Sequence, residues 1–112
     1  MSEVTLEQFA AAHADGAAVI DVREPGEYVD GHVPGAVLMP MGQLPSRSAE
    51  LERSRPVYVI CASGSRSSAM ADFLRHAGFD ARSVAGGTSG WARSGRPGAT
   101  RRPGAASAPW PA

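Results

Sequence analysis

The sequence predicts an α/β fold, a three-layer α/β/α sandwich in which helices cover both faces of a central, mainly parallel sheet. Short apolar runs of strand length alternate with helical patterns along the chain, and the connections between them are short. The 112 residues, 43% of them apolar and 20% charged, fit one domain with one core. Ligands on such sheets gather at the carboxyl ends of the strands.

The first half of the chain predicts one helix and two strands. Thr5 and Gln8 have the spacing of a capping box, so we expect a helix from there to about Ala14. Residues 17–21 (AAVID) are a short apolar run that predicts a buried strand, and residues 37–39 predict a second one.

The middle of the chain contains the clearest strand. Residues 42–54 are Ser-rich and interrupted by Pro45, which predicts only a poor helix. Residues 57–60 (VYVI) are β-branched and aromatic, a composition typical of a strand.

The clearest helix is predicted over residues 67–77 and ends at Gly78. Its apolar residues recur at spacings of three and four: Met70, Phe73, Leu74 and Ala77. A last strand over residues 81–84 leads into two glycines and a short helix at Trp91.

Composition excludes several classes of protein. The chain has one cysteine, so Cys61 cannot form a disulfide within it, and neither C-x-x-C redox chemistry nor a zinc cluster is available. We therefore expect no metal. No apolar stretch approaches the roughly 20 residues of a membrane span, and the start of the chain lacks a signal-peptide pattern. These features predict a cytoplasmic protein that does not engage a membrane.

The sequence divides after Ser94. Residues 95–112 contain four Pro, three Gly, three Arg and no acidic residue, which predicts a disordered tail because this composition cannot bury a core. Residues 1–94 form the predicted domain, with 8 Arg against 11 acidic residues. This balance of charge argues against binding of nucleic acid.

The segment most suited to chemistry is the loop after the best strand. Cys61 stands at the carboxyl end of that strand, and the loop from Ala62 to Arg66 joins it to the best helix. Small residues and Gly64 allow successive backbone N–H groups to converge on one point, where the helix adds its own N–H donors. This arrangement favours the thiolate, which an ordinary cysteine populates to only about 3% at pH 7.

A lone cysteine at a strand end is most often a small buried hydrophobic residue. The context of Cys61 favours a nucleophile instead, because a structural cysteine needs neither a ring of N–H donors nor Arg66 beside it.

Four motifs in order resemble the single-domain rhodanese family of thiosulfate sulfurtransferases, over about residues 4–93. They are Asp21-Val22-Arg23, Gly31-His32-Val33-Pro34-Gly35-Ala36, the C-x-x-G-x-R loop Cys61-Ala62-Ser63-Gly64-Ser65-Arg66 with Ser67, and Gly86-Gly87-Thr88-Ser89-Gly90-Trp91.

The resemblance implies a five-stranded parallel sheet and a ping-pong reaction at catalytic Cys61. The thiolate would take sulfane sulfur from a small anionic donor, thiosulfate or a persulfide, and pass it to a thiol, cyanide or a protein. No cofactor is implied. The substrate-binding residues would be Ala62, Ser63, Gly64, Ser65, Arg66 and Ser67, through their backbone N–H groups and the positive charge of Arg66 at the rim.

Three other matching residues are interpreted as structural support. Asp21 and Arg23 would brace the loop through hydrogen bonds or an ion pair, with Glu27 as a candidate partner. His32 would fix a tight turn by hydrogen bonds, with the alternative that it tunes protons near the thiol.

Two other functions fit parts of the pattern. A cysteine phosphatase or arsenate reductase needs C-x5-R, whereas Arg66 follows Cys61 after four residues and Ser67 stands where the phosphatase arginine would be. This ring is too small for a tetrahedral oxyanion.

A sulfur-relay or regulatory module that does not turn over free donors is the main alternative. The cysteine argues against an inert module, but a relay between proteins is compatible with every motif in the sequence.

Overall fold

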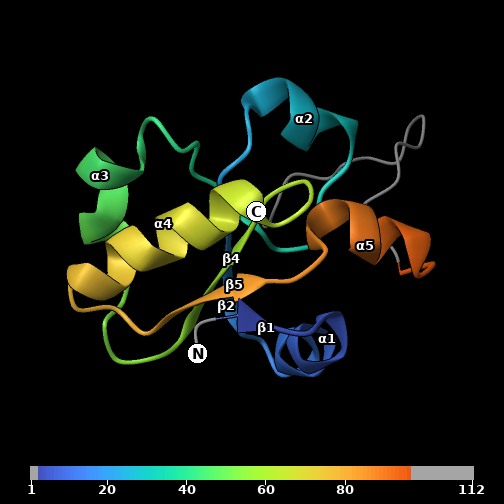
Figure 1. Ribbon diagram of the computed structural model, residues 1–112, viewed down its shortest axis with the longest axis horizontal. Helices are drawn as coiled ribbons and strands as arrows, with labels where there is room; N and C mark the ends of the chain where they lie inside the picture. The colour runs from blue at the N-terminus through green and yellow to red at the C-terminus, as the bar shows by residue number, and fades with distance from the viewer. Residues whose placement is uncertain (1–2, 97–112) are drawn as a thin grey trace.

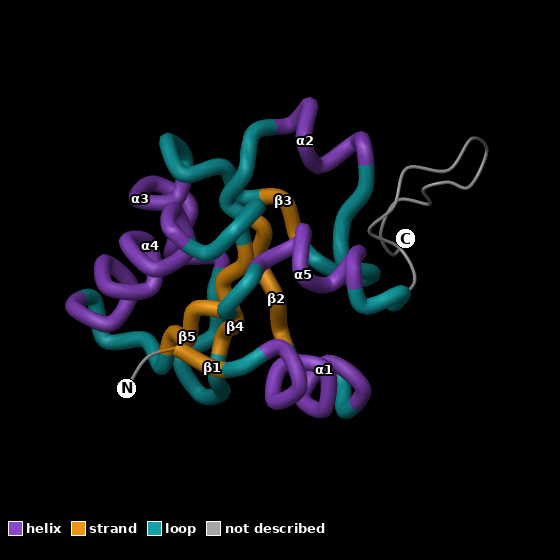
Figure 2. Tube along the Cα trace, turned by 45° about the vertical axis from the view of Figure 1, so that its right-hand side comes forward, coloured by secondary structure: helices purple, strands orange, loops and turns teal. Residues whose placement is uncertain are grey.

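The structure, a computed structural model that describes residues 3–96, contains five parallel strands in one sheet (Figures 1 and 2). The strands are β1 (Glu3–Val4), β2 (Ala18–Asp21), β3 (Val37–Leu38), β4 (Val57–Ile60) and β5 (Ala81–Val84), in the spatial order β1-β5-β4-β2-β3. Ile20 in β2 is in register with Val37 on one side and Val59 on the other. The predicted parallel sheet is confirmed.

Helices lie on both faces of this sheet (Figure 1). They are α1 (Leu6–Ala14), α2 (Pro25–Asp30), α3 (Leu44–Arg47), α4 (Ser65–His76), α5 (Gly87–Arg93) and a short 3-10 helix, η1 (Ser48–Glu50). The α1 and α5 helices cover one face, α3 and α4 cover the other, and α2 lies above the carboxyl ends of the strands. The architecture is therefore the predicted three-layer α/β/α sandwich.

The two faces of the sheet have separate apolar cores. On the α3 and α4 side the buried residues include Ile20, Val59 and Leu74. On the α1 and α5 side they include Phe9 and Trp91, whose rings lie 5.5 Å apart. All four residues of β4 are buried, as expected of a central strand covered on both faces.

Several predicted elements are confirmed with shifted boundaries. The capping box of α1 is present, since the Gln8 backbone N–H donates to Thr5 Oγ1 at 3.0 Å and the Thr5 N–H donates to Gln8 Oε1 at 2.8 Å. The predicted strand 17–21 begins at Ala18. Of the poor helix 42–54, only α3 and η1 form, next to Pro45.

The predicted apolar face of α4 is partly wrong. Leu74 is fully buried, but Phe73 is 39% exposed and Ala77 is exposed. Ser67 and Ala71 are buried with Leu74, since residues three and four positions apart share one face of a helix, and Met70 is partly buried against the same core.

Two elements were not identified from the sequence. The β1 strand has two residues, too short for an alternating pattern, and α2 has six residues that begin with Pro25, which sits in the first turn. The predicted disordered tail lies outside the described residues from position 97 onward. In residues 3–96, no helix combines the length and the apolar character that a membrane crossing requires.

Candidate active site

Cys61 lies directly after β4, at the carboxyl edge of the sheet, and the loop behind it ends at the start of α4. Gly64 precedes α4 with φ of 118°, a left-handed conformation that glycine adopts without a side-chain clash. This turn aims the Gly64 backbone N–H at Cys61 Sγ, 3.0 Å away. The loop geometry therefore places an N–H donor on the sulfur, as the spacing predicts.

The Cys61 side chain has no exposed surface and is part of the apolar core on the α4 side. Burial raises the pKa of the Cys61 thiol, but hydrogen bonds from the Ser67 hydroxyl and from the backbone N–H groups of Ser67, Gly64 and Ser63 together lower it by more. The net result is a pKa below the usual value for cysteine. Cys61 is thus buried in the core with its sulfur directed at polar groups.

Two buried hydroxyls continue from the sulfur in a row. The Cys61 thiol donates to Ser67 Oγ at 3.5 Å, and Ser67 Oγ lies 2.8 Å from the hydroxyl of Ser83 on β5. Ser67 Oγ also donates to the Gly64 carbonyl at 3.1 Å. When Cys61 ionises, the Ser67 hydroxyl can turn to donate to the thiolate while Ser83 donates to Ser67.

Sequence reasoning missed Ser83. The signal that identifies it is a serine in the middle of a strand predicted to be buried, because a buried hydroxyl needs a hydrogen-bond partner.

The loop is held from the other side by α5. The Thr88 N–H donates to the Cys61 carbonyl at 2.7 Å and the Ser89 N–H donates to the Ala62 carbonyl at 3.0 Å. Gly87 has φ of +58°, and a Cβ there would lie 2.5 Å from the Cys61 carbonyl oxygen. The two-glycine motif therefore serves the site by letting α5 approach the Cys61 loop closely.

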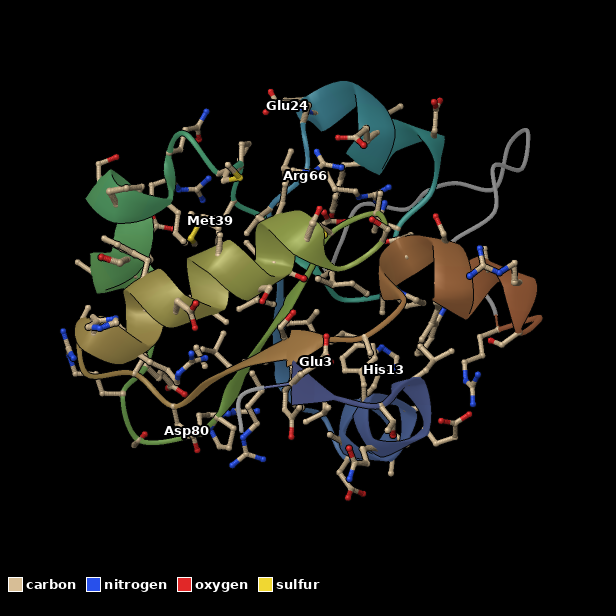
Figure 3. All side chains as sticks on the ribbon, in the orientation of Figure 1. Glu3, His13, Glu24, Met39, Arg66 and Asp80 are labelled. Atoms are coloured by element: carbon tan, nitrogen blue, oxygen red, sulfur yellow. The ribbon has the colours of Figure 1, made fainter. Side chains whose placement is uncertain are left out.

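Arg66 lies in the first turn of α4, beneath α2, and Glu24 caps the start of α2 (Figure 3). Its guanidinium is bound by both oxygens of Glu27, at 2.8 Å and 3.0 Å. Hydrogen bonds from Arg66 and from the Glu24 backbone lower the pKa of Glu27 to about 2, so Glu27 is ionised at neutral pH. Arg66 is at the rim of the loop, but a carboxylate already balances its charge.

Asp21 and Arg23 form a buried ion pair at the end of β2. Arg23 Nη2 donates to Asp21 Oδ2 at 2.8 Å and to the Gly31 carbonyl at 2.8 Å. The pair thereby ties the end of β2 to the end of α2. Glu27, the candidate partner in the sequence analysis, pairs with Arg66 instead.

His32 lies in the irregular segment that follows α2, two residues before the turn at Pro34 and Gly35. Its Nδ1 donates to the Tyr28 carbonyl at 2.8 Å, and its ring stacks on the Tyr28 ring with centroids 3.7 Å apart. The Tyr28 hydroxyl donates to the Ala36 carbonyl at 2.7 Å. One ring nitrogen and one ring face of His32 thus hold the segment after α2 against Tyr28.

The remaining loop residues have small, uncharged side chains. Ala62 is half-buried, and Ser63 and Ser65 are exposed. Among residues 3–96, no group of three or more His, Cys, Asp or Glu side chains has the arrangement of a metal site.

Taken together, these contacts can hold an ionised sulfur at the start of α4. Three backbone N–H groups and one hydroxyl lower the Cys61 pKa, and the N-terminus of the twelve-residue helix α4 adds a favourable dipole. Such a site supports nucleophilic attack by sulfur.

Known proteins share this architecture and parts of this sequence. A family model described as the rhodanese-like domain matches residues 5–94. A rhodanese-related protein from Thermoplasma volcanium superimposes with a TM-score of 0.82 and 31% identity, over 88% of this chain and 97% of that one. A rhodanese-like domain protein from Staphylococcus aureus gives a TM-score of 0.79 and 28% identity, over 91% of this chain and 99% of that one.

Relatives by sequence include a protein named sulfurtransferase from Allochromatium vinosum, 33% identical over 87% of this chain and 94% of the relative. Two Bacillus subtilis proteins are also similar. The uncharacterized protein YqhL is 41% identical over 70% of this chain, and the putative sulfur carrier protein YrkF is 37% identical over 69%. The chain spans only 61% and 43% of these two relatives.

The family model covers most of the chain, and the fold, the loop and the two-glycine motif all agree with the resemblance seen in the sequence. The chain therefore belongs to the rhodanese-like domain family.

Proposed function

We propose that the protein is a sulfurtransferase that carries sulfane sulfur on Cys61. The observation that carries this proposal is the set of hydrogen bonds on Cys61 Sγ, which lower the pKa of a thiol that burial alone would raise. A reactive thiolate in a ring of N–H donors is what attack on a sulfur donor requires.

The reaction has two steps. With thiosulfate, the Cys61 thiolate attacks the outer sulfur, the sulfur–sulfur bond of the donor breaks, and sulfite leaves with the electron pair. The persulfide on Cys61 then gives its outer sulfur to cyanide, to a small thiol or to a protein thiolate, and the Cys61 thiolate returns. A persulfide donor enters the same cycle, with a thiolate in place of sulfite.

The loop supports both steps by the same contacts. The N–H groups of Ser63, Gly64 and Ser67 stabilise negative charge on Cys61 before the attack. They would stabilise the persulfide anion afterwards, and Ala62 and Ser65 add N–H groups to the same loop. The resemblance to a named sulfurtransferase along nearly its whole length supports this chemistry.

Sulfur loading tests the proposal. The full chain is incubated with thiosulfate in one sample and with methanethiosulfonate in another, freed of excess donor and weighed intact, beside Cys61→Ser. We expect a gain of one sulfur atom on the native chain, removed by cyanide, and none on the variant. Absence of cyanide-removable sulfur with both donors would contradict the proposal.

A sulfur relay between proteins is the second candidate, favoured by the similarity to a putative sulfur carrier protein and by the full burial of Cys61. A relay also loads Cys61 but discharges it slowly to cyanide and small thiols. Multiple turnover with cyanide or a small thiol supports the direct transferase, and loading followed by a single slow discharge supports the relay.

A further inference from the structure

The charges around the Cys61 loop cancel in pairs. Arg66 is bound by Glu27 at 2.8 Å, and Arg23 is bound by Asp21 at 2.8 Å. These four groups also act on one another at longer range, since the charges of Asp21 and Arg23 reach Arg66 and Glu27. Each of these two cations thus has a carboxylate partner, and the four side chains together carry no net charge.

The geometry of the Arg66–Glu27 pair engages both terminal nitrogens of the guanidinium. Glu27 Oε1 accepts from Arg66 Nη1 and Glu27 Oε2 accepts from Arg66 Nη2, the fork-to-fork arrangement of a bidentate pair. The side chains are 33% and 36% exposed, so water screens the pair in part, and the bidentate contacts rather than burial hold Arg66 in place. Arg66 is therefore bound to Glu27, and its full charge reaches a donor only when this ion pair opens.

In its thiolate form the sulfur receives hydrogen bonds from uncharged groups. The contacts on Cys61 come from backbone N–H groups and from the hydroxyl of Ser67. Side chains on the loop between Cys61 and Arg66 are small and uncharged. Dipoles of this kind hold one negative charge well, but a second charge entering a buried site loses its hydration without gaining a counter-ion.

Donors of sulfane sulfur differ in the negative charge that they bring to the site. Thiosulfate brings two negative charges to a thiolate that already has one, whereas a protonated persulfide of a neutral thiol brings none. Resting on the proposed function, we propose that the Glu27–Arg66 pair makes this site selective for donors that carry at most one negative charge, such as thiol persulfides, over thiosulfate. Glu27 acts through Arg66 and is a positioning residue.

The step is the same for each donor. A persulfide gives its outer sulfur to the Cys61 thiolate, its sulfur–sulfur bond breaks, and the donor leaves as a thiolate while the proton remains on the new persulfide. Methanethiosulfonate, which replaces one thiosulfate oxygen by a methyl group, gives its outer sulfur in the same way and leaves as methanesulfinate. This donor matches thiosulfate in size and carries one charge less.

The experiment compares the second-order rate constants for loading of Cys61 by methanethiosulfonate and by thiosulfate, in the full-length chain and in Glu27→Gln. The amide side chain in this variant keeps an oxygen to accept the N–H of Glu24, which Glu27 Oε1 accepts at 3.0 Å, so the start of α2 is preserved. Release of Arg66 should raise the thiosulfate value about tenfold and the methanethiosulfonate value about threefold, because the attraction scales with donor charge. The change should shrink in high salt.

Matched variants separate release of Arg66 from a general loss of negative charge. Glu24→Gln removes one charge from the same helix, at an exposed position, and should leave the ratio of the two donors close to that of the native chain. In the double variant Glu27→Gln with Arg66→Gln, the gain should disappear, because there is no cation left to release.

The outcomes distinguish this inference from the proposed function. A native chain that loads faster from methanethiosulfonate, with a ratio that moves toward thiosulfate only in Glu27→Gln, supports the inference. The inference is overturned, and the transferase remains, if the native chain loads but Glu27→Gln leaves the ratio of the two donors' rates unchanged. The same holds if Glu24→Gln changes this ratio as much as Glu27→Gln does. Failure of both donors to load Cys61 overturns the proposed function itself.

Discussion

Cys61 shows how hydrogen bonds outweigh burial at a single atom. A thiol with no exposed surface in an apolar core should have a raised pKa, because burial disfavours the thiolate. The Gly64 N–H at 3.0 Å and the hydroxyl of Ser67 reverse this effect. The reactivity of Cys61 therefore depends on a few specific donors, each of which can be removed.

Substitution of Ser67 and Ser83 tests this dependence. We expect Ser67→Ala to slow alkylation of Cys61 at neutral pH about tenfold, the equivalent of one hydrogen bond to a charged group at about 1.5 kcal/mol. Ser83→Ala should have a smaller effect in the same direction, since Ser83 acts through Ser67 at 2.8 Å. The measurement is the rate of reaction with iodoacetamide as a function of pH.

Ser68→Ala is the matched control, because Ser68 is exposed on the same helix. The expected order of rates is native and Ser68→Ala together, then Ser83→Ala, then Ser67→Ala. If the two buried serines behave as Ser68 does, the hydroxyls do not stabilise the thiolate.

The sequence predicted the residues of the loop better than their partners. Cys61, Gly64 and Arg66 are close in sequence, so the loop between a strand and a helix could be identified from spacing. The partner of Arg66 is Glu27, 39 positions away, and only the folded arrangement of α2 over α4 brings them together. Ser83 has the same origin, because it reaches Ser67 from a different strand.

At the scale of elements, α5 fixes the position of the loop. Its first residues donate to the carbonyls of Cys61 and Ala62, and Gly87 permits this approach. The sequence showed two glycines before Trp91 but not the element that they approach. The contact between Gly87 and Cys61 joins residues that are 26 positions apart in the sequence, so it depends on tertiary structure.

Two glycines of α5 provide a matched pair of substitutions. Gly87→Ala places a Cβ 2.5 Å from the Cys61 carbonyl oxygen at a φ of +58°, and we expect it to cost about 2 kcal/mol or more of stability. Gly90→Ala places a Cβ no closer than 3.8 Å to Leu6 in a helical position, and should stabilise the fold by up to about 1 kcal/mol. Urea unfolding measures both.

Sulfur loading of the same two variants links the stability change to the site. Gly87→Ala should load slowly even under conditions where it is folded, because the loop carbonyls are displaced, whereas Gly90→Ala should load as the native chain does. Equal effects of the two substitutions on stability and loading would show that the close approach of Gly87 has no special role.

At the scale of the whole molecule, the parallel sheet assembles the site. Asp21 ends β2, Cys61 follows β4 and the two glycines follow β5, and parallel strands end at the same edge. This arrangement follows from the alternation of apolar runs and helical patterns, so the sequence predicted it. The two-residue strand β1 has no such pattern, because its place in the sheet comes from pairing with Ser83 and Val84.

Acid stability of the whole domain reports on the ion pair between α2 and α4. The pKa of Glu27 falls from 4.5 to about 2 on folding, so between these pH values the unfolded chain binds more protons than the folded one. The pair therefore stabilises the fold above about pH 4.5, and this contribution is lost as the pH falls toward 2. For a pair this exposed we expect no more than about 1 kcal/mol.

The check is the free energy of unfolding of the native chain and of Glu27→Gln between pH 2 and pH 6. Their difference should grow as the pH rises through this window and then stay constant, while the remaining carboxylates contribute equally to both. A difference that does not change with pH would show that Glu27 titrates alike in the folded and unfolded chains.

The most direct test of the account is the pKa of Cys61 in the folded chain, measured from the rate of alkylation against pH, with the same chain in denaturant as an internal reference. We expect the reactivity of Cys61 to rise with pH at a lower midpoint in the folded protein than in the denatured one, because the loop stabilises the thiolate. A folded midpoint equal to or above that of the denatured chain would contradict it, since burial would then govern the sulfur.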